Sequence, residues 1–153
     1  MGNEHLILVL DNVRSLYNVG AIFRLADGLG VNQIMLCGIT PGPPRAEIHK
    51  TALGAETHVE WNAFASTSEC LTKLKNDQFN VVALEITPLS VPLQNFTPIF
   101  PMALVVGHET DGVSSDVLRD INSHVHIPML GHAKSLNVAT AVAIACWQIK
   151  RNV

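Results

Sequence analysis

The sequence predicts an α/β fold in which helices flank a mostly parallel sheet. Short apolar runs alternate along the chain with segments whose apolar residues recur at helical spacing. Most of these runs lack the in/out alternation of a half-exposed strand, as strands covered on both faces do. Of the 153 residues, 48% are hydrophobic and 15% are charged, a composition that excludes a disordered chain. Because this is the length of one domain, we expect residues 1–153 to form a single domain.

Six short apolar runs bounded by turn residues predict the strands of the sheet. In chain order they span residues 5–10, 33–37, 57–61, 80–84, 102–106 and 124–127. Prolines predict loops in two of the intervening segments, residues 38–44 and 87–101, because proline lacks the N–H that a helix or a strand ladder needs.

Four segments between the strands predict helices. In residues 18–30, five apolar side chains recur every three or four residues and share one face: Val19, Ile22, Phe23, Ala26 and Leu29. Ser66 and Glu69 form a capping box that opens a helix to about residue 76. A short helix over residues 115–121 and a long one over residues 136–150 complete the pattern.

Charge and hydropathy exclude several classes of protein. The net charge is −3, unlike the basic footprint of a protein that coats nucleic acid, but compatible with an enzyme that has a local basic cleft. No apolar run approaches the ~20 residues of a membrane helix. Glu4 stands where a secretory signal carries a base. We therefore expect a cytoplasmic protein that contacts no membrane.

Cysteine and histidine spacing predicts no metal site. The cysteines form no CxxC pair, so we expect small apolar fillers at Cys37, Cys70 and Cys146. His124 and His126 alternate on an expected strand, but no carboxylate or cysteine accompanies them at ligand spacing. The GxGxxG fingerprint and the GxxxxGK[ST] loop of nucleotide-binding proteins are also absent.

The first of three distinctive stretches covers residues 10–24, where a strand is followed by a polar turn and a helix start. A helix start offers free N–H groups and a partial positive charge to a ligand. Gly20 and Arg24 lie one turn apart, so we expect a helix face with room for a ligand beside the guanidinium. Taken alone, Asn18 also fits an N-cap, and Arg24 a surface ion pair.

The second stretch, residues 103–113, is an apolar strand that runs into Gly107, Glu109 and Gly112. Glycine at the carboxyl end of a strand permits a ligand to approach the backbone closely. Ligands of open α/β sheets bind at that end. An ordinary turn is the alternative interpretation.

The third stretch, residues 127–141, leaves a strand at Pro128 and passes through a loop to Ser135 and Asn137, which are residue types favoured at helix starts. Small side chains follow at Ala139, Ala141, Ala143 and Ala145. Such a helix can pack very close to another backbone, either in the core or in a dimer interface.

Together the three stretches resemble the motifs of the SpoU/TrmH class of SPOUT RNA ribose methyltransferases. The matching residues are Asn18-x-Gly20-x3-Arg24, Val106-Gly107-x-Glu109-x2-Gly112-Val113 and Ile127-Pro128-Met129-x5-Ser135-Leu136-Asn137-Val138. The motifs agree in order and placement over roughly residues 8–149. The resemblance implies a homodimer whose C-terminal segment threads through a loop to form a deep trefoil knot.

The resemblance also implies that the knot loops bind S-adenosylmethionine, and that a methyl group passes to a ribose 2′-hydroxyl of tRNA or rRNA. A compact RNA such as tRNA fits a chain of this size better than a large assembly does. The implied cofactor-binding residues are Leu84, Gly107, Ile127, Met129, Ser135, Leu136 and Asn137. The implied catalytic residues are Arg24, Asn18, Glu109, Ser135 and Asn137.

The implied roles follow from side-chain chemistry. A guanidinium is a poor base, so Arg24 would anchor a phosphate and stabilise developing alkoxide charge. Asn18, Ser135 and Asn137 would orient the nucleotide. Glu109 would either orient Arg24 or hold the knot loop.

The length leaves no room for the added RNA-binding domain of larger family members, so we expect the dimer itself to hold RNA. The candidate contacts are Arg14, Arg45, Lys50 and Lys134. Alternatives are a base methyltransferase of the same knotted superfamily, a non-catalytic RNA-binding module and a generic nucleotide-binding protein. The missing phosphate loop argues against the last of these, and the presence of Arg24 with Asn18 and Ser135 argues against the second.

Overall fold

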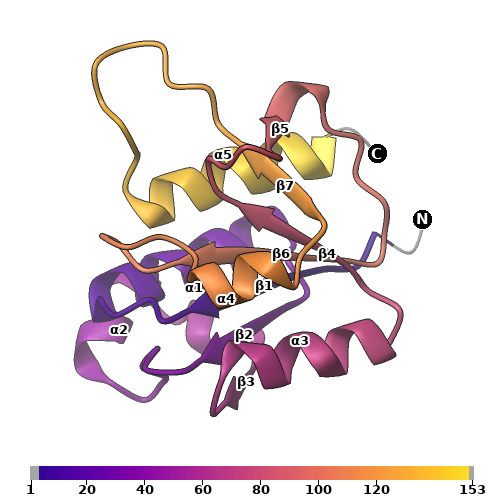
Figure 1. The fold of residues 1–153 in the computed structure, drawn as a ribbon. Coiled ribbons are helices and arrows are strands. Elements are labelled where there is room, and N and C mark those ends of the chain that lie inside the picture. Colours follow the sequence, from indigo (N-terminus) through magenta and orange to yellow (C-terminus); the bar gives the residue numbers. More distant parts are fainter. Residues whose placement is uncertain (1–3, 152–153) are drawn as a thin grey trace.

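A computed structural model describes residues 4–151 and shows one parallel sheet flanked by helices (Figure 1). Within this part of the chain the sheet has seven strands in the order β3-β2-β1-β6-β4-β7-β5. They are β1 (Leu6–Asp11), β2 (Gln33–Cys37), β3 (Glu60–Phe64), β4 (Asn80–Leu84), β5 (Val91–Pro92), β6 (Met102–Gly107) and β7 (Ser123–His126). Every neighbouring pair is parallel, so all carboxyl ends meet at one edge.

The helices divide between the two faces of the sheet (Figure 1). They are α1 (Leu16–Leu29), α2 (Ala46–Ala52), α3 (Thr67–Asn76), α4 (Ser115–Arg119) and α5 (Val138–Arg151), with short 3-10 turns η1 (Ala55–Thr57) and η2 (Leu93–Asn95). Apolar residues of α1, α2 and α5 form a core on one face of the sheet, and those of α3 and α4 form a core on the other. Strands β1 and β6 lie between both cores and are buried at every position, as their uninterrupted apolar runs predict.

The structure corrects several expected boundaries. Helix α1 begins at Leu16, because the Ser15 hydroxyl accepts the N–H of Asn18 and so serves as the N-cap; Asn18 is not the cap. Strand β3 lies three residues later than expected, since residues 55–57 form η1. Helix α5 begins at Val138, after Asn137.

Two segments form secondary structure that was not predicted. Helix α2 has seven residues and buries only Ile48 and Ala52, too few to show helical periodicity. The proline-rich segment 87–101, expected to be a loop, contributes the two-residue strand β5 and the turn η2.

Gly20 is a packing residue between α1 and α2. A Cβ added at Gly20 would lie 2.0 Å from Oγ1 of Thr51 and 2.2 Å from the backbone oxygen of Ile48. The Thr51 hydroxyl also donates a 2.8 Å hydrogen bond to the backbone oxygen of Tyr17. The expectation that Gly20 leaves room for a ligand is therefore wrong, because helix α2 occupies that space.

All three cysteines are buried and free, which confirms their expected role as small apolar fillers. The hydrogen bond that the Cys37 thiol donates to Cys70, together with burial, raises the pKa of Cys37 far above its usual range. Burial raises the pKa of Cys146 to about 12. Because the thiolate is the reactive form, these two side chains are unreactive at neutral pH. No helix in residues 4–151 has the length and apolar character needed to cross a membrane.

The α1–α2 contact gives a prediction about stability. Gly20→Ala should lower the free energy of unfolding by about 1–3 kcal/mol, because the new methyl group must push the two helices apart. The matched control is Gly28→Ala on the same helix, where an added Cβ meets nothing within 4 Å. That substitution should stabilise the protein by about 0.5–1 kcal/mol through helix propensity. Urea unfolding measures both; equal effects at the two positions would contradict the packing role.

Candidate functional site

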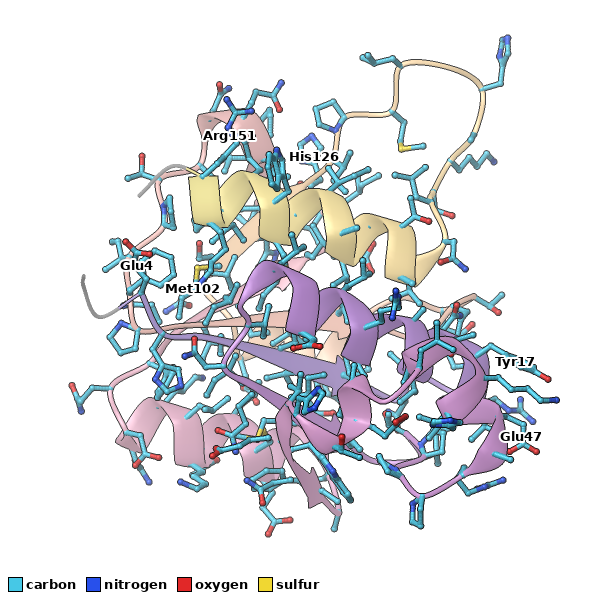
Figure 2. The ribbon with its side chains drawn as sticks, turned by 180° about the vertical axis from the view of Figure 1, so that it is seen from behind. Glu4, Tyr17, Glu47, Met102, His126 and Arg151 are labelled. Atoms are coloured by element: carbon cyan, nitrogen blue, oxygen red, sulfur yellow. The ribbon has the colours of Figure 1, made fainter. Side chains whose placement is uncertain are left out.

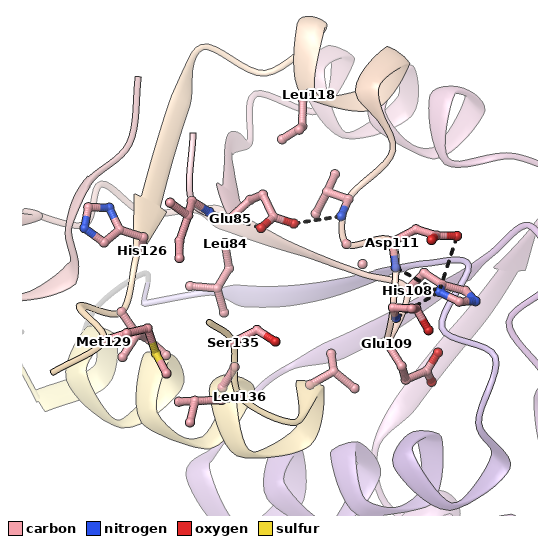
Figure 3. A pocket seen from close by; sticks show the side chains of 18 residues that line it. Leu84, Glu85, His108, Glu109, Asp111, Leu118, His126, Met129, Ser135 and Leu136 are labelled. Atoms are coloured by element: carbon pink, nitrogen blue, oxygen red, sulfur yellow. Dashed lines mark hydrogen bonds and ion pairs between the residues drawn. The ribbon is translucent and has the colours of Figure 1, made fainter. Parts of the chain in front are cut away.

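A cavity of about 400 Å³ lies at the carboxyl ends of β4, β6 and β7 (Figure 3). Three chain segments supply most of its lining: residues 84–86 at the end of β4, residues 107–113 at the end of β6, and the segment that joins β7 to α5. Leu118 of α4 and the first turn of α5 complete it. We call residues 107–113 the knot loop. The cavity lies at the carboxyl edge of a parallel sheet, which is the usual place for a ligand in this class of fold, and the volume of the cavity suits a small molecule.

The structure brings six of the seven expected cofactor-binding residues to this cavity. These are Leu84, Gly107, Ile127, Met129, Ser135 and Leu136. Asn137, the seventh, lies beside the cavity but does not line it. Its side-chain oxygen accepts the N–H groups of Ala139 at 2.9 Å and Thr140 at 3.3 Å, so Asn137 caps helix α5.

Three of the expected catalytic residues form one hydrogen-bonded chain. Asn137 Nδ2 donates to Asn18 Oδ1 at 3.2 Å, and Asn18 Nδ2 donates to Glu109 Oε1 at 3.3 Å. These contacts join α5, α1 and the knot loop, three parts of the chain that are far apart in sequence. Ser135 lines the cavity near this chain but is not bonded into it.

Glu109 fastens the knot loop to the start of α1. Its Oε1 accepts the N–H of Ser15 at 2.8 Å, and its Oε2 accepts the N–H of Arg14 at 3.2 Å. Partial burial by itself would raise the pKa of Glu109, but hydrogen bonds from Ser15, Arg14 and Asn18 outweigh it and lower the pKa. Of the two roles expected for Glu109, the geometry supports holding the loop, since within residues 4–151 Glu109 forms no hydrogen bond or ion pair with Arg24.

Arg24 stands apart from the other expected catalytic residues. Its side chain is exposed and forms neither a hydrogen bond nor an ion pair with the part of the chain that the structure describes. Arg24 follows Asn18 by six positions, so the Arg24 side chain points about 120° away from that of Asn18 around the axis of α1. The structure therefore brings Arg24 neither to the cavity of its own chain nor into the surface ion pair that was the alternative.

Two carboxylates that the sequence analysis missed also hold the knot loop. Glu85 accepts the N–H of Ile86 at 3.1 Å and that of Val113 at 3.0 Å. Buried Asp11 accepts the N–H of Ser114 at 2.9 Å and is bonded by the hydroxyl of Thr67. Asp11 ends an apolar strand and Glu85 directly follows one. The position of an acidic residue at the carboxyl end of an apolar run is the sequence signal that could have identified both.

Two glycines let the knot loop fold back on itself. A Cβ at Gly107 would lie 2.1 Å from the backbone carbon of Gly112, and a Cβ at Gly112 would lie 2.2 Å from Oε2 of Glu85. Gly112 also has a φ of 70°, which favours glycine. Gly107 lines the cavity, but its missing side chain makes room for the loop's own backbone, which revises the expectation that it makes room for a ligand.

The cavity wall is apolar and acidic. It contains the carboxylates Glu85, Glu109 and Asp111, and no lysine or arginine is among its described lining residues (Figure 3). Nδ1 of His108 accepts the N–H groups of Thr110 and Asp111, at 3.1 and 3.2 Å. Such a wall favours a cationic ligand over a phosphate.

The histidines considered as metal ligands have other partners. His124 and His126 are hydrogen-bonded through Nδ1 to the hydroxyls of Thr87 and Ser90, at 2.7 and 2.8 Å. They fix the turn at residues 87–90 to β7. Between residues 4 and 151 no group of three or more histidine, cysteine, aspartate or glutamate side chains could hold a metal ion.

The lowered pKa of Glu109 predicts a pH-dependent contribution to stability. A carboxylate whose folded pKa lies below its ordinary value of about 4.5 stabilises the protein above that value, and the contribution disappears as the pH falls through the folded pKa. Glu109→Gln should therefore be less stable than wild type at neutral pH, and the difference should shrink in acid. Urea unfolding at a series of pH values tests this, with the exposed Glu60→Gln as control. A difference independent of pH would contradict it.

Comparisons with known proteins agree with this geometry. The model of the SpoU rRNA Methylase family matches residues 5–147. A tRNA (guanosine(18)-2'-O)-methyltransferase from Borreliella burgdorferi is 28% identical over 146 residues, which are 95% of this chain and 66% of the relative. The chain spans less than two thirds of the length of the first curated relatives that it matches.

Solved structures show the same fold. An AdoMet-bound rRNA methyltransferase from Sinorhizobium meliloti superposes with a TM-score of 0.92 at 27% identity, over 99% of this chain and 58% of the other. A structure concerned with the 2-OH methylation of C/U34 on tRNA gives 0.86 at 25% identity, over 99% and 97% of the two chains. The structural neighbours have the knot fold, which confirms the predicted fold class with its C-terminal trefoil knot. The chain belongs to the SpoU methylase family.

Proposed function

We propose that this protein is an S-adenosylmethionine-dependent methyltransferase that modifies a ribose 2′-hydroxyl of tRNA in the cytoplasm. The observation that carries the proposal is the cavity wall, which combines apolar side chains with three carboxylates and has no lysine or arginine among the lining residues that the structure describes. A cationic sulfonium joined to an adenosine suits this wall, whereas the phosphates of a nucleotide cofactor would be repelled by it.

The residues present fit this cofactor. Leu84, Ile127 and Leu136 supply apolar surface for an adenosine, and the carboxylates of the knot loop supply negative charge for its cationic part. When bound, the cofactor provides a methyl group on a sulfonium, which is a good leaving group. The protein's task is then to align the ribose hydroxyl and to help remove its proton.

The hydrogen-bonded chain of Asn137, Asn18 and Glu109 would orient the nucleotide at the cavity mouth. Because this chain is tied to α1, α5 and the knot loop together, its amide groups are held in fixed positions before RNA binds. Such preorganised donors stabilise charge that develops during reaction. Ser135 completes the set of polar side chains at the cavity.

Relatives support tRNA as the substrate. The curated relative from Borreliella burgdorferi is named as a methyltransferase of guanosine 18 in tRNA. The solved structure of which 97% is covered by this chain concerns the 2-OH methylation of C/U34 on tRNA. Nucleoside mass spectrometry of tRNA from cells with and without this protein tests the proposal. Loss of one 2′-O-methylnucleoside is the expected result; loss of a base-methylated nucleoside would establish the alternative base methyltransferase.

We also propose a homodimer that buries the outer face of α5. The inner face of this helix, with Val142, Cys146 and Ile149, packs in the core. The outer face exposes Trp147 by 59% and Ile144 by 40%, next to an apolar groove lined by Leu93 and Pro128 among others. Large apolar side chains gathered on one helix face are typical of an obligate interface.

A pair of leucines in one segment tests the cofactor site. Leu136 lines the cavity, whereas Leu130 is 97% exposed and does not. Leu136→Ala should weaken S-adenosylmethionine binding about tenfold, because apolar contact with the ligand is lost. Leu130→Ala should leave it unchanged. Titration calorimetry with S-adenosylmethionine and its demethylated product measures both; no binding to wild type at millimolar concentration would contradict the proposed cofactor.

Arg24 is expected to act on the RNA and not on folding or cofactor binding. Arg24→Ala should slow single-turnover methylation about 10²–10³-fold, because a charge-assisted contact to the ribose-phosphate is lost. Arg24→Lys should also be slow, since an ammonium cannot reproduce the planar fork. Lys73→Ala, on the far helix α3, is the control. A rate near wild type for Arg24→Ala would remove Arg24 from the mechanism.

Since Arg24 faces away from its own cavity, we propose that it serves the cavity of the second subunit. Mixed dimers of Arg24→Ala with Leu136→Asp test this arrangement. Each mixed dimer then combines one intact cavity with one intact Arg24, so a random mixture should recover about a quarter of the wild-type rate. No recovery would show that Arg24 acts within its own chain.

The dimer interface makes a separate prediction. Trp147→Glu should give a monomer, because an unpaired carboxylate would have to be buried in an apolar interface. Leu53→Glu, at an exposed leucine away from α5, should remain a dimer. Sedimentation velocity distinguishes the two states. A wild-type monomer of 16.6 kDa at micromolar concentration would overturn the interface.

A further inference from the structure

Tyr17, the only tyrosine in the chain, is an exposed aromatic side chain beside the candidate site. Its side chain is 51% exposed and makes no hydrogen bond within the described residues 4–151. It directly precedes Asn18, which belongs to the hydrogen-bonded chain at the cavity mouth. Figure 2 shows Tyr17 projecting from the surface close to Glu47 of α2.

The backbone under Tyr17 is rigid although the ring is exposed. The Thr51 hydroxyl donates a 2.8 Å hydrogen bond to the backbone oxygen of Tyr17, and Gly20 brings α2 into close contact one turn later. The backbone of Tyr17 is therefore held in place, and the ring extends from it into solvent. An exposed ring on a fixed backbone loses little conformational freedom when a flat partner binds to it.

Basic side chains outnumber acidic ones on α1, α2 and their starts, although the chain as a whole is acidic. Four exposed cations lie on α1 and α2 or at their starts, and none has an ion-pair partner among residues 4–151: Arg14, Arg24, Arg45 and Lys50. Of the acids on these two helices, Asp27 pairs with His58 at 3.8 Å, which leaves Glu47 as the one without a partner in the described structure.

Tyr17 and Arg24 share one stripe of α1. Seven residues are almost two full turns, so the two side chains point the same way, about 10 Å apart along the helix. Single-stranded nucleic acids bind where an aromatic ring that stacks on a base stands beside cations that hold the backbone. This stripe has both elements.

We propose that Tyr17 stacks on an unpaired base of the RNA, next to the nucleotide that is methylated. This inference rests on the proposed function, and it adds Tyr17 to the residues that contact the RNA substrate. Stacking on a base is the same before and during methyl transfer, so it should affect RNA affinity and leave the chemical step unchanged.

The test compares Tyr17→Ala, Tyr17→Leu and Tyr17→Phe. Methylation of total tRNA from cells lacking the protein gives KM and kcat, and anisotropy of the same tRNA carrying a fluorescein label gives affinity without turnover. Loss of a stacked base should raise KM and Kd about 5-fold or more for Ala and Leu, with kcat within about twofold. Phe, which keeps the ring, should match wild type. Ile99→Ala, at another exposed apolar residue, is the control.

Each outcome has a distinct meaning. If Leu performs as well as Phe, or Ala as well as wild type, Tyr17 does not stack on RNA. If the variants lose the dimer in sedimentation or stability in urea instead of affinity, Tyr17 is a packing residue and the inference is wrong. If wild-type protein binds tRNA in a Tyr17-dependent way without methylating it, the stacking stands and the proposed function fails. If wild-type protein neither binds nor methylates tRNA, both are overturned.

Discussion

The candidate site depends on three carboxylates that hold the knot loop in place. Asp11, Glu85 and Glu109 each accept backbone N–H groups across a boundary between the loop and its surroundings. These N–H groups lie beyond the ends of β1 and β6, where they have no strand partner, and a partly buried N–H without an acceptor is costly. The same carboxylates that satisfy the loop also line or adjoin the cavity. Carboxylates therefore both stabilise the fold of the loop and set the charge of the ligand that the cavity favours.

The glycines of the family motifs are explained here by packing. Gly107 and Gly112 allow the knot loop to close on itself, and Gly20 allows α2 to approach α1. In each case an added Cβ would lie within 2.3 Å of a protein atom. None of these glycines needs a ligand to explain it. The ligand-facing chemistry comes instead from the side chains that these close contacts bring together.

Helix α1 divides its tasks between two sides. Asn18 points toward the knot loop and α5, whereas Gly20 packs against α2 on the side where the side chains of Tyr17 and Arg24 are exposed. Helix α5 shows a similar division between its core face and its outer face with Trp147. This arrangement places the proposed cofactor cavity and the proposed RNA surface on neighbouring sides of one rigid helix. A nucleotide held on the outer face would then reach the cavity of the second subunit, which Arg24 is proposed to serve.

The sequence by itself determined the parallel sheet, because uninterrupted apolar runs require cover on both faces. It also determined the long helices α1 and α5, because their apolar residues recur at helical spacing over several turns. It also placed Gly107 and Glu109 at the carboxyl end of a strand, where ligands of such folds bind; the knot itself came from the family resemblance. Only the tertiary structure decided the short helix α2, the exact position of β3, the loop-holding roles of Asp11 and Glu85, and the outward direction of Arg24. Each of these depends on which distant segment a residue meets, and local periodicity carries no information about partners far away in the chain.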